Sequence, residues 1–331
     1  MSRSSPERFC GLGIPRMMQY TLSIVHAPGR LSMSVVLITG AATGIGNLTA
    51  QALASDGHTV FASVRDLHGD NAQHAHELLD RARPDAVDLR VIELDVLSQT
   101  SADAAIRTVL EAAGQLDVVI HNAGHLYLGY VEAFTAEELA HVFDVNALGL
   151  QRVNRAALPH MRARRCGTLI YVGSTTTVSV PPFLGPYVAS KFAFDALAHT
   201  TAYEVSQFGI ETTIVMPGAF TKGTAHFPSA TPASDTAVTK AYSVLDPMVA
   251  RNKEATEALF PPEADADPIA VAREIARVVA LPPGQKPFRT VVDFTNTGVE
   301  EVNAAARRHQ ERFLSGMGFS ELLEIKRPPA N

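Results

Sequence analysis

Two residues with complementary proton chemistry lie four positions apart in the segment GPYVASKF, residues 185–192. Tyr187 carries a phenol that can exchange a proton, and Lys191 carries a cation. In a helix, positions i and i+4 share one face, so an ammonium there favours the phenolate and lowers the pKa of Tyr187. The pair therefore predicts a proton-transfer site, whereas its spacing alone also fits a turn of an ordinary helix. The surrounding elements decide between the two.

A glycine-rich turn precedes this pair, in the segment TGAATGIG at residues 39–46. It follows an apolar run typical of a buried strand and opens a helical pattern. Glycines let the backbone turn tightly and approach a pyrophosphate, which the amides and dipole of a helix N-terminus stabilise. The turn predicts a dinucleotide site, although a glycine-rich turn alone is often only a turn.

Apolar strands and amphipathic helices alternate along most of the chain, as parallel α/β folds require. We expect one α/β domain with a doubly wound parallel sheet, a Rossmann fold. The predicted strands are 34–40, 58–64, 87–96, 116–124, 167–174, 210–218 and 287–294. The predicted helices are 45–55, 71–82, 101–114, 136–164, 187–207 and 267–282.

The remaining segments break this alternation. Residues 1–33 are predicted to be a disordered extension or a misassigned start, with a targeting peptide as the alternative. Residues 34–294 form the predicted dinucleotide-binding and catalytic domain, which includes a mobile substrate loop with a short helix at 219–265. Residues 295–331 are predicted to be a helical tail that joins an oligomer contact or covers the pocket.

The composition excludes several classes of protein. The 331 residues are 46% hydrophobic and 19% charged with a net charge of −6, which predicts a soluble globular protein. No sustained Lys/Arg block is present, so nucleic acid is not an expected partner. Residues 166–190 carry no charge, but their Pro, Gly, Ser and Thr predict a strand and loop lining a dry pocket, not a membrane helix. Two cysteines indicate neither a disulfide framework nor a zinc site, so we expect a cytoplasmic protein without a metal.

Five motifs in the expected order give this chain a family resemblance. The motifs are the glycine spacing at 40, 44 and 46, HNAG at 121–124, DVNALG at 144–149, GST at 173–175 leading to YVASK at 187–191, and PGAF at 217–220. With these motifs, the chain resembles the short-chain dehydrogenase/reductase family. The resemblance covers roughly residues 34–294. It implies an NAD(P)-dependent oxidoreductase, and a homodimer or homotetramer assembled through helices that begin near Ala136 and Tyr187.

The resemblance assigns four catalytic residues. Tyr187 would be the general acid/base, and Lys191 would lower its pKa and hold the nicotinamide ribose. Ser174, 13 residues before Tyr187, would hydrogen-bond the substrate oxygen, and Asn146 would position a water that links Lys191 to solvent. These roles suit hydride transfer to a carbonyl, because the resulting alkoxide needs a proton donor and a hydrogen-bond donor. Taken singly, Ser174 could be a turn residue, Asn146 a helix-surface residue and Tyr187 a core aromatic.

The same resemblance implies a set of cofactor contacts besides Tyr187 and Lys191. They are Gly40, Thr43, Gly44, Ile45, Gly46, Arg65, Asp95, Val96, Asn122, Ala123, Gly124, Pro217, Gly218 and Thr221.

The end of the second strand bears on which dinucleotide binds. A carboxylate there accepts the ribose 2′-hydroxyl of NAD, but Val64 holds that place and Arg65 follows it, which favours NADP. Asp66 lies 20 residues after Gly46, near the position where the general rule expects a ribose-binding acid, so NAD stays open.

The segments at 125–130, 178–186 and 219–265 are apolar and aromatic, so a hydrophobic ketone, aldehyde or alcohol is the expected substrate. Two functions follow: an NADP-dependent oxidoreductase, or a dinucleotide sensor or scaffold without turnover. The complete set of four catalytic residues favours the enzyme.

Overall fold

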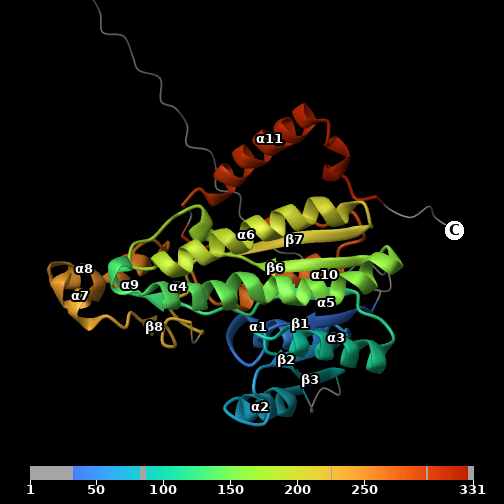
Figure 1. Cartoon of the computed structure of the whole chain (residues 1–331), viewed down its shortest axis with the longest axis horizontal. Coiled ribbons are helices and arrows are strands. Elements are labelled where there is room, and N and C mark those ends of the chain that lie inside the picture. Colours follow the sequence, from blue (N-terminus) through green and yellow to red (C-terminus); the bar gives the residue numbers. More distant parts are fainter. Residues whose placement is uncertain (1–32, 83–86, 225, 296, 327–331) are drawn as a thin grey trace, which may run out of the picture. The chain divides into compact units, whose positions relative to one another are not determined.

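A central sheet of seven parallel strands organises the computed structural model, which describes residues 33–82, 87–224, 226–295 and 297–326 (Figure 1). The strand order is β3-β2-β1-β4-β6-β7-β9. The strands are β1 (Val35–Ile38), β2 (Thr59–Val64), β3 (Leu89–Glu93), β4 (Val118–His121), β6 (Gly167–Val172), β7 (Ile210–Pro217) and β9 (Arg289–Val292). The predicted doubly wound α/β fold is confirmed.

Helices cover both faces of the sheet. The first face packs against α3 (Gln99–Ala113), α5 (Gly149–Arg164) and α6 (Gly185–Ser206), whose buried residues join strand residues in one core. The second face packs against α1 (Gly44–Ser55), α2 (Ala72–Ala82) and α10 (Ile269–Ala280) in a second core. The strand order reverses between β1 and β4, and ligands of such folds bind beyond the carboxyl ends of strands at this point.

The predicted helix over 136–164 is interrupted. It consists of α4 (Ala136–Phe143), a π-helical segment (Asp144–Leu148) and α5. The extra residue in the π turn is accompanied by hydrogen bonds between the Asn146 amide and a neighbouring loop, described below. Interruptions of this kind frequently occur at functional sites.

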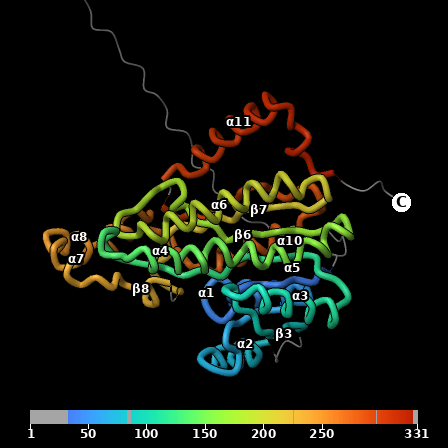
Figure 2. The backbone as a smooth tube through the Cα atoms, viewed as in Figure 1, coloured from blue at the N-terminus to red at the C-terminus, as the bar shows by residue number. Residues whose placement is uncertain are grey.

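The segment 219–265 holds more regular structure than the expected loop with one short helix. It contains β8 (Thr231–Pro232), α7 (Thr236–Ala241), α8 (Asp246–Ala250) and α9 (Asn252–Glu257), and its path can be followed in Figure 2. β8 pairs in parallel with β5 (Tyr127–Leu128). Tyr130 stacks on Tyr242 at 4.9 Å between ring centres. The segment is therefore fastened to the chain that follows β4.

The described part of the tail contains α11 (Val299–Met317), in red in Figure 1. The tail meets the end of α6 through a hydrogen bond from the Gln207 side chain to the Glu321 carbonyl at 2.6 Å, and one from the Lys326 amide to the Ser206 carbonyl at 2.9 Å. Thr295 and Thr297, at the start of the tail, line the cavity described below, and no described residue after Thr297 lines it. The predicted extension at 1–33 lies, except for Met33, outside the described residues.

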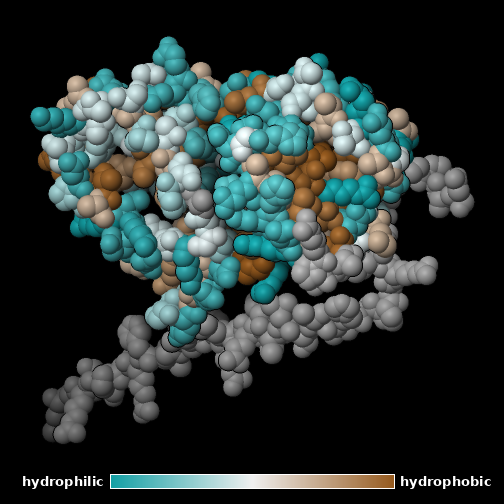
Figure 3. All heavy atoms as spheres, turned by 90° about the horizontal axis from the view of Figure 1, so that it is seen from below, coloured by the Kyte–Doolittle hydropathy of each residue, from teal (hydrophilic) through white to brown (hydrophobic). Residues whose placement is uncertain are grey.

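The surface shown in Figure 3 is mainly hydrophilic, with hydrophobic residues in a few patches. Among the described helices, none has the length and apolar character needed to cross a bilayer.

Candidate active site

A cavity of about 970 Å³ runs along the carboxyl ends of the strands. This volume lies at the upper end of the usual range for ligand pockets. Of the residues predicted to bind cofactor or to act in catalysis, the cavity is lined by Gly40, Thr43, Gly44, Ile45, Arg65, Asp95, Val96, Asn122, Ala123, Gly124, Ser174, Tyr187, Lys191, Pro217 and Gly218. Gly46, Asn146 and Thr221 do not line it, and Thr224 does. The fold thus brings most of the predicted residues to one cavity.

The glycine-rich turn between β1 and α1 has the shape of a phosphate cradle. Gly40 has a φ of +65°, and a Cβ there would lie 2.9 Å from the Ala123 Cα. A Cβ on Gly46 would collide with the Asn122 amide and the Gly40 carbonyl, whereas one on Gly44 would meet open space. Thr43 is the N-cap residue of α1, and among the described residues its side chain makes no capping hydrogen bond to the first turn of the helix. The free amides of this helix start therefore fit a pyrophosphate.

Tyr187 lies in the first turn of α6, just after Pro186, and its side chain is buried. Burial raises the pKa of Tyr187 to about 12, and a hydrogen bond with Ser174 opposes this rise. Burial thus outweighs Ser174, and the expectation that Lys191 lowers the pKa of Tyr187 stays a prediction. The phenol is the stable form at neutral pH, as a proton donor requires.

Lys191 is buried one turn further along α6. Its Nζ donates a hydrogen bond to the Val172 carbonyl at 3.0 Å and lies 4.7 Å from the centre of the Phe194 ring. Burial lowers the pKa of Lys191 to about 8. The ammonium still predominates at pH 7 and faces the cavity, where it can meet hydroxyl or phosphate oxygens.

Ser174 follows the end of β6 and caps a single 3-10 turn, Thr175–Thr177. Its Oγ accepts hydrogen bonds from the Thr176 amide at 3.1 Å and from the Thr176 hydroxyl at 2.9 Å. The side chain is buried and lines the cavity beside Tyr187. A hydroxyl in this place can donate to an oxygen bound in the cavity.

Asn146 lies behind the cavity wall in the π-helical segment. Its Oδ1 accepts from the His125 amide at 2.7 Å, and its Nδ2 donates to the His125 carbonyl at 2.9 Å and to Ser190 Oγ at 2.8 Å. A Cβ on Gly124 would lie 3.5 Å from Asn146 Oδ1 and 3.9 Å from Lys191 Nζ. Asn146 thus holds the loop after β4 close to Lys191.

Arg65 and Asp66 differ in how they meet the cavity. Arg65 directly follows β2 and lines the cavity together with Asn71, whose amide donates to the Arg65 carbonyl at 2.7 Å. Asp66 is not among the lining residues and has a φ of +50°. Its Oδ2 accepts from the Asp70 amide at 2.7 Å, while Glu93 accepts from the Asp66 amide at 2.8 Å. The carboxylate of Asp66 is therefore occupied by its own turn.

The cavity also meets residues that sequence analysis missed. His226 packs edge-on against Tyr187 with ring centres 5.4 Å apart. Burial, then the charges of Lys191 and His125, lower the pKa of His226 to about 4, so this ring is neutral at pH 7. His226 belongs to no motif, and Thr176 is one of three consecutive threonines, so neither could be singled out. Within the described residues, no group of His, Cys, Asp and Glu side chains could hold a metal ion.

Comparisons with known proteins agree with this arrangement. A family model described as short chain dehydrogenase matches residues 34–233. The 3-ketodihydrosphingosine reductase of Bacteroides thetaiotaomicron is 33% identical over 189 residues, which cover 57% of this chain and 65% of that protein. The human 17-beta-hydroxysteroid dehydrogenase type 1 is 36% identical over 194 residues, 57% of either chain. This chain thus spans less than two thirds of the length of these curated relatives.

Two solved structures share the fold. A short-chain dehydrogenase from Streptomyces avermitilis superposes with a TM-score of 0.67 at 26% identity, covering 87% of this chain and 97% of that one. An alcohol dehydrogenase from the archaeon Thermococcus sibiricus, complexed with 5-hydroxy-NADP, gives a TM-score of 0.61 at 26% identity and covers 78% and 96%. With the family model matching well over half of its length, this chain belongs to the short-chain dehydrogenase family.

Proposed function

We propose that this protein is an NADP-dependent oxidoreductase that interconverts a hydrophobic ketone or aldehyde and the corresponding alcohol. One observation carries the proposal. Ser174, Tyr187 and Lys191 line the same cavity as the uncapped start of α1, so a proton donor and a dinucleotide cradle share one space.

The reaction divides between the cofactor and the side chains. A reduced nicotinamide held beside Tyr187 and Lys191 would supply the hydride, two electrons with one proton, that the carbonyl carbon takes up. Tyr187 gives its phenolic proton to the carbonyl oxygen, and Ser174 donates a hydrogen bond to that oxygen as charge develops. Lys191 stabilises the resulting phenolate and binds the ribose hydroxyls. Oxidation of the alcohol reverses these steps.

We propose a positioning role for Asn146 behind this site. Within the described part of the chain, the three hydrogen bonds of its amide go to His125 and Ser190, so it holds the loop after β4 next to Lys191. A water between that loop and Lys191 would return a proton from solvent to Tyr187.

The preference for NADP rests on the end of β2. Arg65 and Asn71 line the cavity and can meet a 2′-phosphate, whereas the carboxylate of Asp66 is engaged by the Asp70 amide. A guanidinium favours a phosphate, and a free carboxylate at this place would repel it. NAD is the alternative cofactor.

The proposed substrate class follows from the other side of the cavity. Its wall includes Leu126, Val180, Leu184 and Phe227 together with the neutral ring of His226. Relatives of this chain are named for 3-ketodihydrosphingosine and for a hydroxysteroid, which supports a hydrophobic ketone or alcohol.

We also propose a cytoplasmic homodimer or homotetramer whose catalytic domain spans residues 34–294. The family resemblance supports the assembly, and light scattering after size-exclusion chromatography measures its mass.

A direct test titrates the purified protein with NADPH and NADH by fluorescence. The decay of reduced-nicotinamide absorbance is then followed with a panel of hydrophobic ketones and aldehydes. We expect tighter binding of NADPH and turnover of at least one carbonyl. Binding without turnover would favour a dinucleotide sensor, and higher catalytic efficiency with NADH would contradict the cofactor assignment.

A further inference from the structure

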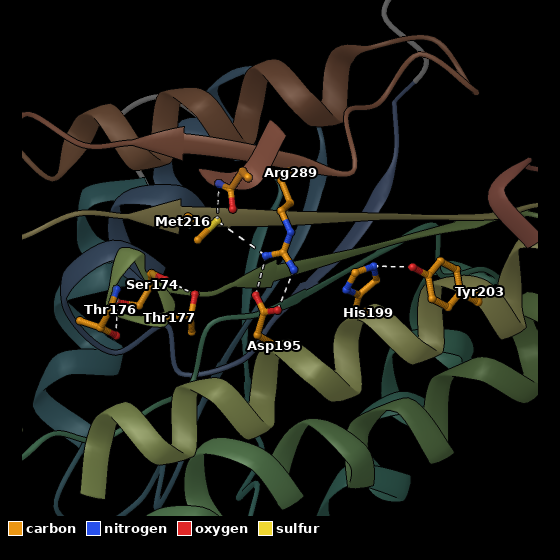
Figure 4. A network of polar contacts seen from close by, with 9 residues as sticks. Ser174, Thr176, Thr177, Asp195, His199, Tyr203, Met216 and Arg289 are labelled. Atoms are coloured by element: carbon orange, nitrogen blue, oxygen red, sulfur yellow. Dashed lines mark hydrogen bonds and ion pairs between the residues drawn. The ribbon is translucent and has the colours of Figure 1, made fainter. Parts of the chain in front are cut away.

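The turn after β6 places one threonine hydroxyl directly on Ser174. A serine hydroxyl has one hydrogen to donate and two lone pairs to accept with. Ser174 Oγ accepts from the Thr176 amide at 3.1 Å and from Thr176 Oγ1 at 2.9 Å, as Figure 4 shows. Both acceptor positions of Ser174 are therefore filled by Thr176, and the single hydrogen of Ser174 is left to point elsewhere.

The cavity gives this hydrogen a direction. Ser174 lines the cavity beside Tyr187, so its free hydrogen can be donated to an oxygen bound there. With Thr176 as the donor between the two hydroxyls, Ser174 keeps that hydrogen available. Ser174 also lowers the pKa of Tyr187 against the effect of burial, which fits donation to the phenolate oxygen.

The turn itself closes without the Thr176 hydroxyl. The Thr176 amide already caps it, and Thr177 Oγ1 donates to the Ser174 carbonyl at 3.0 Å. The Val178 and Ser179 amides both donate to the Thr175 carbonyl at 2.9 Å. The hydroxyl of Thr176 is thus an additional contact whose effect falls on Ser174.

Thr176 and Thr177 also differ in their surroundings. Both are half-buried and belong to the same turn, but Thr176 lines the cavity and Thr177 does not. The chain therefore contains a matched pair of threonine hydroxyls, one bonded to the side chain of Ser174 and the other to its backbone.

We propose that Thr176 is a positioning residue for the reaction, whose hydroxyl keeps the one hydrogen of Ser174 available for the oxygen beside it in the cavity, either the reacting oxygen or the Tyr187 phenolate. The inference rests on the proposed function. Without the Thr176 hydroxyl, Ser174 can rotate and accept a hydrogen bond, which removes the donor from the reacting oxygen. Hydrogen bonds accepted by an oxygen also polarise its own O–H, so Thr176 strengthens Ser174 as a donor.

The test replaces Thr176 by valine, which has the same shape but no hydroxyl. With NADPH and the best carbonyl, we expect Thr176→Val to lower kcat about tenfold, as loss of one hydrogen bond at a reacting centre does, while KM changes by less than about twofold. In alcohol oxidation, Tyr187 must act as a base, so the acidic limb of the pH–rate profile should move to higher pH. Thr176→Ser should retain both properties.

Two controls separate this role from general damage. Thr177→Val removes the neighbouring hydroxyl and should leave kcat and the pH profile unchanged. Ser174→Ala should lower kcat, and adding Thr176→Val to it should cost nothing further, because Thr176 acts through Ser174.

The outcomes distinguish this inference from the function on which it rests. If the wild type turns over a carbonyl and Thr176→Val has the same kcat and pH profile as the wild type, the inference is overturned and the proposed function stands. An equal loss in Thr177→Val, or a full further loss on the Ser174→Ala background, would likewise overturn the inference alone. A wild type that turns over no carbonyl with either dinucleotide would overturn the proposed function and the inference with it.

Discussion

The Nζ of Lys191 lies 5.9 Å from the centre of the Tyr187 ring and donates its hydrogen bond to the carbonyl of Val172 at 3.0 Å. The ammonium is thus tied to strand β6 beside the phenol. Burial keeps the pKa of Tyr187 at about 12 and that of Lys191 at about 8, so a neutral phenol and a cation coexist at pH 7. This combination provides a proton donor with a nearby charge that stabilises the phenolate left after transfer.

Removal of the phenolic hydroxyl tests the assignment of the acid. Tyr187→Phe should lower kcat by about 10²- to 10⁴-fold, the usual contribution of a positioned general acid. NADPH affinity should change little, because the dinucleotide cradle at α1 is untouched. Steady-state kinetics with a fluorescence titration measure both, and a variant that retains wild-type kcat would show that another group supplies the proton.

The cofactor preference should follow Arg65. Arg65→Ala should lower kcat/KM for NADPH by about tenfold, as loss of a charge-assisted hydrogen bond to phosphate does, and leave that for NADH within about twofold. Asp66→Asn is the control, since an asparagine oxygen still accepts from the Asp70 amide and the carboxylate does not line the cavity. Equal losses with both dinucleotides in Arg65→Ala would refute this assignment.

Most residues that the motifs single out line one cavity, partly because several motifs follow strand ends and parallel strands bring their carboxyl ends to one edge of the sheet. Ser174 follows β6 and Gly40 follows β1, so their meeting is a consequence of the topology. The π-helical segment at Asn146 was not predictable, because the hydrogen bonds that accompany it go to His125, 21 residues earlier in the chain. His226 approaches Tyr187 only through the path of the 219–265 segment, which carries no periodic signal.

A half-buried ion pair fastens the edge strand β9 to the catalytic helix α6. Arg289 donates from both terminal nitrogens to Asp195 at 2.6 and 2.7 Å, and the two side chains are 19% and 15% exposed (Figure 4). Arg289→Ala should lower the free energy of unfolding by about 2 kcal/mol or more, because it leaves a carboxylate partly buried without its partner.

Arg277 provides the matched control. It pairs with Glu274 on the same helix, and its side chain is 52% exposed. Arg277→Ala should cost less than about 1 kcal/mol. Urea denaturation of both variants measures the free energy of unfolding. Equal decreases in the two variants would show that the Arg289–Asp195 pair stabilises the fold no more than the exposed pair does.

A buried histidine predicts acid destabilisation. His121 stacks on Tyr171 at 4.6 Å, and burial lowers its pKa from 6.5 to about 3, with Asn154 opposing the shift. The unfolded chain therefore binds a proton below pH 6.5 that the folded chain excludes. Stability is fully present above pH 6.5 and falls as the pH decreases toward 3, by up to about 1.4 kcal/mol per pH unit.

His121→Asn removes this titration, because an asparagine is neutral at every pH. The free energy of unfolding of the variant should change less between pH 7 and pH 4.5 than that of the wild type, whatever their difference at pH 7. Identical changes in the two proteins would mean that His121 does not carry this acid sensitivity.

The most direct measurement of the central claim is transfer of an isotope. The protein is incubated with NADPH deuterated at the transferable position of the nicotinamide and with a hydrophobic ketone that it turns over, and the alcohol is analysed by mass spectrometry. Hydride transfer predicts one deuterium on the carbinol carbon in the wild type and almost no labelled product from Tyr187→Phe. An alcohol that forms without deuterium would contradict the proposed mechanism.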